Sequence, residues 1–231
     1  MPKKKQDRRV ALIRNSILSV AALIAASIVG YITYVGSGLD EGAITEGQDY
    51  FAIEDPRRSR PGDPIEVVEF FAYGCVHCKT FDPVIESWAE NQPDDVAFRR
   101  APTTFSPAYA LLSQTYYALE EADLLEQHHA RLFRAIHESG RQFLRPQDVA
   151  EWLDGRGISA EAFLRIFDSP AVRAKVRAAE RDQRAYQISA TPQMVVAGKY
   201  LVTMNGGQRR ALDVLDYLIE KQRQADAAAT N

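Results

Sequence analysis

Three patterns of apolar positions follow one another in the first part of the chain. A continuous apolar run without charged side chains, residues 17–35, comes first. After a polar stretch, a run rich in β-branched and aromatic residues, 65–71, predicts a buried strand. This strand pattern stops at Gly74, and apolar residues then recur every three or four positions to about Asn91. That spacing predicts an amphipathic helix that follows directly on the strand.

The later part of the chain combines a second strand with a long helical region. Residues 96–101 predict a strand that completes a βαβ unit, and hence a parallel pair with a right-handed crossover. From Ser106 to about Tyr186 the pattern is helical throughout, and Pro107 stands at a first helical position behind a capping serine. Residues 50–53 predict a further strand, and residues 209–223 predict a last helix. Between the helical region and this last helix, residues 194–197 and 200–203 predict the two strands of a hairpin. Together these elements predict an α/β domain with a helical subdomain inserted between its strands.

The distribution of charge divides the chain at its first apolar run. Residues 1–15 carry six basic side chains against one acid, a net charge of +5, whereas the whole chain is −3, so the rest sums to −8. As a helix, residues 17–35 would span about 28 Å, close to the ~30 Å hydrocarbon core of a bilayer. A basic flank stays on the cytoplasmic side of a membrane. We therefore predict a basic cytoplasmic flank (1–16), a transmembrane anchor (17–35) and the rest of the chain across the membrane.

A cleaved signal peptide is the alternative interpretation of the same segment. The apolar part of a signal peptide normally has ~7–15 residues and ends at a small-x-small site. Here the apolar run is longer, and the small residues at 36–38 make a poor cleavage site. The length favours an uncleaved anchor, whereas cleavage would leave a soluble protein.

The chain after the apolar run divides into a tether, one domain and a tail. Residues 36–48 are small, polar and acidic, as in a short linker, and residues 225–231 are an Ala-rich, flexible tail. Between them, residues 49–224 are enough for one domain with a sizeable core. The helical subdomain occupies about 106–186 of this domain.

Both cysteines of the chain lie in one motif, Cys75-Val-His77-Cys78, in the first turn of the predicted helix. The unpaired N–H groups and the dipole of a helix N-terminus favour negative charge, and the thiolate is the form of cysteine that attacks disulfides. Cys75 is therefore the candidate nucleophile, and Cys78, one turn further on, can close a disulfide with it. His77 can stabilise the thiolate by a hydrogen bond or by its charge.

Zinc binding is the main competing use of a CxxC motif. A structural zinc site needs four ligands, usually with a second Cys or His pair. His128 and His129 point about 100° apart on a helix, and His137 has no partner four residues away. We expect no metal site, and we expect these histidines to be solvated or to cap helices. A purely structural disulfide is also disfavoured, because strained disulfides tend to be labile.

The motif Cys-Val-His-Cys, preceded by Glu69-Phe-Phe, closely resembles the Cys-Pro-His-Cys site of the DsbA family, the thiol:disulfide oxidoreductases of the bacterial periplasm. The resemblance extends over about 49–223. It implies a thioredoxin fold with an inserted all-helical subdomain, here preceded by the predicted N-terminal transmembrane helix. It also implies that the Thr191–Pro192 bond is cis, packs against the CxxC motif and offers backbone groups to an extended substrate peptide.

Glu69 is unusual because it places a carboxylate inside an otherwise apolar strand, six residues before Cys75. A buried acid is costly unless it is paired or neutral. The resemblance implies that Glu69 is a buried acid that assists proton transfer at the resolving thiol, and that Arg100 on the neighbouring strand lies near it. An exposed position at a strand end is the alternative.

Two residues depart from the usual pattern of the family. Val76 replaces the proline of Cys-Pro-His-Cys, and Thr191 replaces the valine common before the cis-proline. Threonine at that position is also found in related disulfide isomerases. Both positions tune redox potential and substrate release, so they bear on the direction of the reaction.

The resemblance implies an oxidase that donates the redox-active disulfide Cys75–Cys78 to reduced, unfolded exported proteins and binds no cofactor. A quinone-linked membrane oxidase of the DsbB kind would reoxidise it, and no nucleic-acid partner is expected. The predicted location is the inner membrane with the catalytic domain in the periplasm, or the soluble periplasm after cleavage. The alternatives are a disulfide isomerase, a reductase such as those of cytochrome maturation, and a non-catalytic peptide-binding chaperone.

Overall fold

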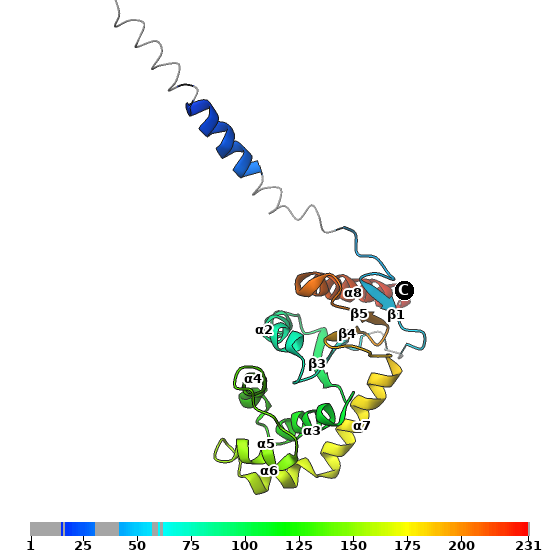
Figure 1. The fold of residues 1–231 in the computed structure, drawn as a ribbon. Coiled ribbons are helices and arrows are strands. Elements are labelled where there is room, and N and C mark those ends of the chain that lie inside the picture. Colours follow the sequence, from blue (N-terminus) through cyan, green and yellow to red (C-terminus); the bar gives the residue numbers. More distant parts are fainter. Residues whose placement is uncertain (1–14, 16, 31–41, 57–59, 61, 231) are drawn as a thin grey trace, which may run out of the picture. The chain divides into compact units, whose positions relative to one another are not determined.

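The computed structural model describes residues 15, 17–30, 42–56, 60 and 62–230, and the chain divides into two compact units, Met1–Ala43 and Ile44–Asn231. Residues 17–30 of the first unit are helical (Figure 1). Among the described residues, no helix combines the length and the apolar character needed to cross a bilayer. Residues 31–35 of the predicted anchor and nearly all of the basic flank lie outside the described residues. The end of the predicted tether, from Ile44, belongs to the second unit.

A five-stranded mixed sheet forms the centre of the second unit, with strand order β1-β5-β4-β2-β3. The strands are Tyr50–Ala52 (β1), Ile65–Phe71 (β2), Val96–Pro102 (β3), Gln193–Val196 (β4) and Tyr200–Val202 (β5). As predicted, β2 and β3 are parallel and are joined by a helix, α2 (Val76–Glu90), whereas the other neighbouring strands are antiparallel. In the central strand β2, Glu69 pairs with Arg100 of β3 on one side and with Met194 of β4 on the other.

The predicted helical insertion is confirmed between β3 and β4. Its helices are α3 (Pro107–Glu121), α4 (Leu125–His137), α5 (Pro146–Leu153), α6 (Ala160–Phe167) and α7 (Pro170–Ala185). They gather on one side of the sheet, and α7 leads back to it (Figure 1). The predicted start is also correct, because the Ser106 hydroxyl caps α3 by accepting a hydrogen bond from the Tyr109 N–H and Pro107 occupies the first turn.

The last part of the second unit is a hairpin followed by a long helix. In the turn between β4 and β5 the Lys199 N–H donates to the Val196 carbonyl, and Ala197 and Gly198 both have positive φ. The predicted hairpin is therefore confirmed, with Ala197 and Gly198 in its turn. The last helix, α8 (Gly207–Thr230), is longer than predicted, because the Ala-rich segment expected to be a tail continues it and alanine has a high helix propensity.

Two hydrophobic clusters include side chains of β2. Val67 packs in a cluster with Phe81 of α2, whereas Val68 belongs to a cluster that includes Leu132 of the helical insertion. Successive side chains of a strand point to opposite faces, so Glu69 shares the face of Val67. The central strand therefore places a carboxylate beneath the helix that carries the two cysteines.

Candidate active site

Cys75 and Cys78 lie at the start of α2, directly after the central strand. Cys75 is the N-cap residue of this helix, and its Sγ accepts a hydrogen bond from the Cys78 N–H at 3.4 Å. Both are free thiols, with Cys75 partly buried and Cys78 buried. The sulfur of Cys75 therefore occupies the position where a helix N-terminus stabilises a negative charge.

The two thiols differ strongly in acidity. The pKa of Cys75 is lowered to about 5, foremost by a hydrogen bond from the Cys78 side chain, with further contributions from Thr191 and the backbone N–H of His77, while burial opposes them. The pKa of Cys78 is raised by its hydrogen bond to Cys75 and by burial. At neutral pH the pair is a Cys75 thiolate beside a Cys78 thiol. Since the thiolate is the nucleophilic form, this difference supports Cys75 as the candidate nucleophile.

Thr191 and Pro192 lie beside this pair, and the peptide bond between them is cis. The Sγ of Cys75 is 3.3 Å from the carbonyl oxygen of Thr191. The predicted cis bond and its closeness to Cys75 are therefore confirmed. The Thr191 side chain also forms a hydrogen bond that lowers the pKa of Cys75. The valine common at this position in the family has no hydroxyl and would not form that bond.

His77 lies in the first turn of α2, and the residue is exposed. Its described contribution to the Cys75 thiolate is made by the backbone N–H, which lowers the pKa of Cys75. The sequence suggested a hydrogen bond or a charge from the imidazole. The structure adds this main-chain contribution, and the role of the imidazole stays a prediction.

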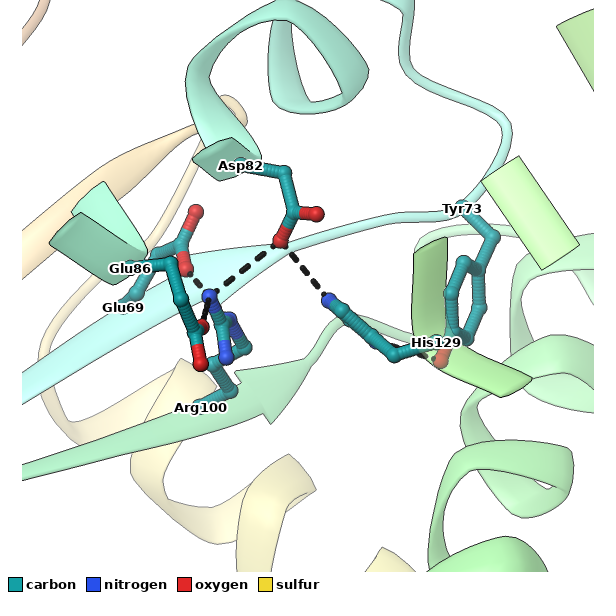
Figure 2. A network of polar contacts seen from close by, with 6 residues as sticks. All are labelled: Glu69, Tyr73, Asp82, Glu86, Arg100 and His129. Atoms are coloured by element: carbon teal, nitrogen blue, oxygen red, sulfur yellow. Dashed lines mark hydrogen bonds and ion pairs between the residues drawn. The ribbon is translucent and has the colours of Figure 1, made fainter. Parts of the chain in front are cut away.

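Glu69 is buried, with 2% of its surface exposed, which excludes the alternative of an exposed strand end. As predicted, Arg100 lies beside it, and Nε of the guanidinium donates to Oε2 of Glu69 at 3.1 Å (Figure 2). Burial raises the pKa of Glu69 to about 7, although the charge of Arg100 opposes that shift. The carboxyl group is therefore close to half-protonated at neutral pH, which suits a group that takes up and releases protons.

Two acids of α2 share the guanidinium with Glu69. Nη2 of Arg100 lies 3.2 Å from Oδ1 of Asp82 and also bonds to Glu86. Because Cys78, Asp82 and Glu86 are four residues apart, they lie on one face of the helix. The sequence contained this spacing, but it offered no reason to separate these two acids from ordinary solvated helix residues.

The three histidines of α4 are bonded inside the protein, so the prediction that they are solvated or cap helices is wrong. His128 and His129 are buried. Nε2 of His128 bonds to the Arg156 carbonyl at 2.8 Å. Nε2 of His129 bonds to the Asp82 carboxylate at 2.9 Å, and Nε2 of His137 bonds to the Tyr73 carbonyl at 2.8 Å. The helix contacts α2 as well as its neighbours in the insertion, so side chains in different directions meet protein. No group of three or more His, Cys or acidic side chains among the described residues is arranged to hold a metal ion.

Tyr109 of α3 lies over Gly74, the residue before Cys75. A Cβ at Gly74 would be 2.9 Å from Cε1 of the Tyr109 ring, so a side chain at this position would force the ring to shift. Burial raises the pKa of the Tyr109 phenol, and the two cysteines raise it further. Tyr109 is therefore a neighbour of the dithiol that the sequence did not indicate, since a helical tyrosine is typical of an ordinary core position.

A thioredoxin-like sheet with a helical insertion, a CxxC thiolate at the start of a helix and a cis-proline beside it define a class of protein, the thioredoxin-fold thiol:disulfide oxidoreductases. Residues 66–219 match the model of the DSBA-like thioredoxin domain family. The chain is 38% identical over 213 residues to the thiol:disulfide interchange protein DsbA of Azotobacter vinelandii, which covers 90% of this chain and 98% of that relative. It is 37% identical over 215 residues to the DsbA of Pseudomonas aeruginosa, with 92% and 98% covered. The crystal structure of Pseudomonas aeruginosa DsbA has a TM-score of 0.76 at 36% identity and covers 83% of this chain and 99% of that chain.

The chain therefore belongs to the DsbA-like thioredoxin domain family. Its activity is thiol:disulfide interchange, an oxidoreductase activity. The thioredoxin fold with a helical insertion and the thiol:disulfide interchange chemistry, both expected from the resemblance, are thus confirmed. The membrane anchor and the direction of the reaction stay predictions.

Proposed function

We propose that this protein is an oxidase that donates the Cys75–Cys78 disulfide to reduced, unfolded exported proteins. The observation that carries the proposal is the position of Cys75 as N-cap of α2, where its Sγ accepts a hydrogen bond from the Cys78 N–H and its pKa is lowered to about 5. The groups that lower this pKa stabilise a thiolate, which exists only after the disulfide has been reduced. Because they favour the reduced form, they make the disulfide more oxidising.

In the proposed reaction, a substrate thiolate attacks Sγ of Cys75 in the disulfide, and the bond to Cys78 breaks as the mixed disulfide forms. Cys78 leaves with the electron pair and takes up a proton, with Glu69 and Arg100 as the proposed proton-transfer residues. A second substrate thiolate then attacks the substrate sulfur, and Cys75 leaves as the stabilised thiolate. The substrate loses two electrons and gains a disulfide, and the enzyme holds both electrons as the reduced pair.

Thr191 and Pro192 are the proposed substrate-binding residues. The Thr191 carbonyl lies 3.3 Å from Sγ of Cys75, so a peptide that pairs with this main chain would bring its own cysteine to that sulfur. Main-chain pairing depends little on the sequence of the peptide. It suits an enzyme with many unfolded substrates. His77 completes the proposed catalytic set through its position in the first turn of α2.

The proposal includes a location and a redox partner. The net charge of +5 in residues 1–15 and the uncharged run 17–35 support a cytoplasmic flank, a single membrane anchor and a short tether before a periplasmic catalytic domain, residues 49–224. A quinone-linked membrane oxidase of the DsbB kind would restore the disulfide. Reporter fusions after Gly38 should be active only in the periplasm. A mature N-terminus near Ser37 would instead identify a cleaved signal peptide and a soluble periplasmic protein.

The reduction potential of the Cys75–Cys78 couple tests the direction of the reaction. Equilibration with glutathione buffers should give a value above about −180 mV, as in strong oxidants of this fold. A value near about −270 mV would identify a reductant and support the reductase alternative. A Cys75→Ser/Cys78→Ser variant that retains full activity in refolding assays would support the non-catalytic chaperone.

A further inference from the structure

Helix α4 holds the segment that leads into the cysteine motif at two points. Nδ1 of His129 lies 2.7 Å from the hydroxyl oxygen of Tyr73, and Nε2 of His137 lies 2.8 Å from the carbonyl oxygen of the same residue. Tyr73 is two residues before Cys75 and is fully buried. Both histidines bond the same residue, so both point from α4 toward this segment. The helical insertion therefore reaches the active-site segment directly.

The other nitrogen of His129 joins the polar cluster beneath the cysteines. Nε2 lies 2.9 Å from Oδ1 of Asp82, the same oxygen that Arg100 approaches to 3.2 Å. Arg100 in turn donates to Glu69 at 3.1 Å, so a continuous chain of polar contacts links Tyr73, His129, Asp82, Arg100 and Glu69 (Figure 2). This series of polar contacts connects α4 to the central strand β2.

The His129 ring has a partner for either of its charge states. The Asp82 carboxylate accepts a hydrogen bond, so Nε2 carries a hydrogen. Burial raises the pKa of Tyr73 well above its ordinary value, so its hydroxyl stays protonated. That hydroxyl donates to Nδ1 of a neutral imidazole and accepts from Nδ1–H of a charged one. The imidazole of His129 therefore keeps both hydrogen bonds when it takes up a proton.

The charges around Arg100 do not balance without an additional proton. The side chains of Glu69 and Asp82 are only 2% and 14% exposed, and they share a single guanidinium. Glu86 is half-exposed, so water solvates its charge. An uncompensated buried charge is costly, and a proton on Glu69 or on His129 removes it. Among the described residues, Tyr116 of α3 also faces His129, 6.0 Å away between ring centroids, and burial raises the pKa of Tyr116 so that it stays neutral.

We propose that His129 is a positioning residue for Glu69, the acid beneath the cysteines. Together His129 and Glu69 hold one proton, and the charges of Asp82 and Arg100 between them couple the two sites. In this way α4 controls the charge of Glu69. This inference rests on the proposed role of Glu69 in proton transfer at Cys78. A charge on His129 favours ionisation of Glu69, and a neutral His129 favours the protonated carboxyl group.

The direct test is a titration of the Glu69 carboxyl group by infrared difference spectroscopy, assigned with Glu69→Gln. His129→Gln keeps a donor for Asp82 and an acceptor for Tyr73 but carries no charge, so the Glu69 midpoint should rise by about half a pH unit or more. His128→Gln is the matched control, because the hydrogen bond described for that buried histidine goes to a backbone carbonyl and not to the polar cluster. In this variant the Glu69 midpoint should equal that of the wild type. Equal midpoints in all three proteins, or equal shifts in both variants, would overturn the proposal.

A reciprocal measurement keeps the test decisive if His129→Gln folds poorly. Coupling between two sites is mutual, so Glu69→Gln should move the nuclear magnetic resonance titration of the His129 ring to lower pH, although the two side chains are not in contact. An unchanged His129 titration would overturn the coupling. Neither titration depends on catalysis. If the wild type had no exchange activity, the proposed function would be refuted, but the titrations would still measure the coupling between Glu69 and His129.

Discussion

The Sγ of Cys75 lies 3.3 Å from the carbonyl oxygen of Thr191, although the two residues are 116 positions apart in the chain. The antiparallel pairing of β2 with β4 causes this closeness. β2 ends shortly before Cys75, β4 begins directly after Pro192, and Phe70 pairs with Gln193. Because the Thr191 side chain lowers the pKa of Cys75, the acidity of the thiol is set jointly by the first turn of α2 and by a segment that follows the helical insertion.

Thr191→Val should raise the pKa of Cys75 from its value of about 5, because it removes a side-chain hydrogen bond that favours the thiolate. Hydrogen bonds to charged groups are the strong ones, and we expect a rise of about one pH unit. Thiolate absorbance in the ultraviolet, followed during a pH titration, measures it. Thr191→Ser is the matched control, since it retains the hydroxyl. A rise of the same size in both variants would show that the hydroxyl is not the cause.

His77→Ala should change the pKa of Cys75 less than Thr191→Val does. The backbone N–H of residue 77 lowers this pKa, and the substitution leaves that group in place. The same absorbance titration measures both variants side by side. A larger effect of His77→Ala would assign the stabilisation to the imidazole, as the sequence suggested.

The stability of the reduced protein should depend on pH through Cys75. Its pKa is about 5 in the folded state and ~8.5 in the unfolded state, so between these values the unfolded chain binds more protons. The stabilisation is full above about pH 8.5 and is lost as pH falls through about 5. Denaturant unfolding at pH 7 should find the reduced form more stable than the oxidised form, with a gap that narrows toward pH 5. A more stable oxidised form would contradict the oxidase proposal and favour a reductase.

The two cysteines should behave differently when each is replaced alone. Cys75→Ser should abolish exchange, because Cys78 is buried and its pKa is raised. Cys78→Ser should retain attack at Cys75 but trap mixed disulfides with substrates, since the resolving thiol is gone. Non-reducing electrophoresis followed by mass spectrometry identifies the linked cysteine. Adducts at Cys78 in Cys75→Ser, with none at Cys75 in Cys78→Ser, would reverse the assignment.

The sequence by itself determined the elements that depend on local pattern. An apolar run rich in β-branched and aromatic residues, together with helical periods, located the βαβ unit and the insertion 106–186, and Ser106-Pro107 located the start of α3. Two cysteines at the junction of strand and helix were enough to indicate thiolate chemistry, because a helix N-terminus has this electrostatic effect in any fold. The cis Thr191–Pro192 bond followed only from resemblance to a family, since nothing local in the chain requires it.

The tertiary structure alone decided which side chains share an environment. The spacing of residues on α4 showed that His128 and His129 point in different directions, but not that protein covers both directions. In the same way, the sequence left Glu69 either buried or exposed, and the pairing of β2 between β3 and β4 decided it. Periodicity describes the faces of one element, whereas burial and the pKa of a buried group depend on what a second and a third element bring to that face. The bonds from Asp82 to Arg100 and His129 join α2, β3 and α4, and only their packing brings these three elements together.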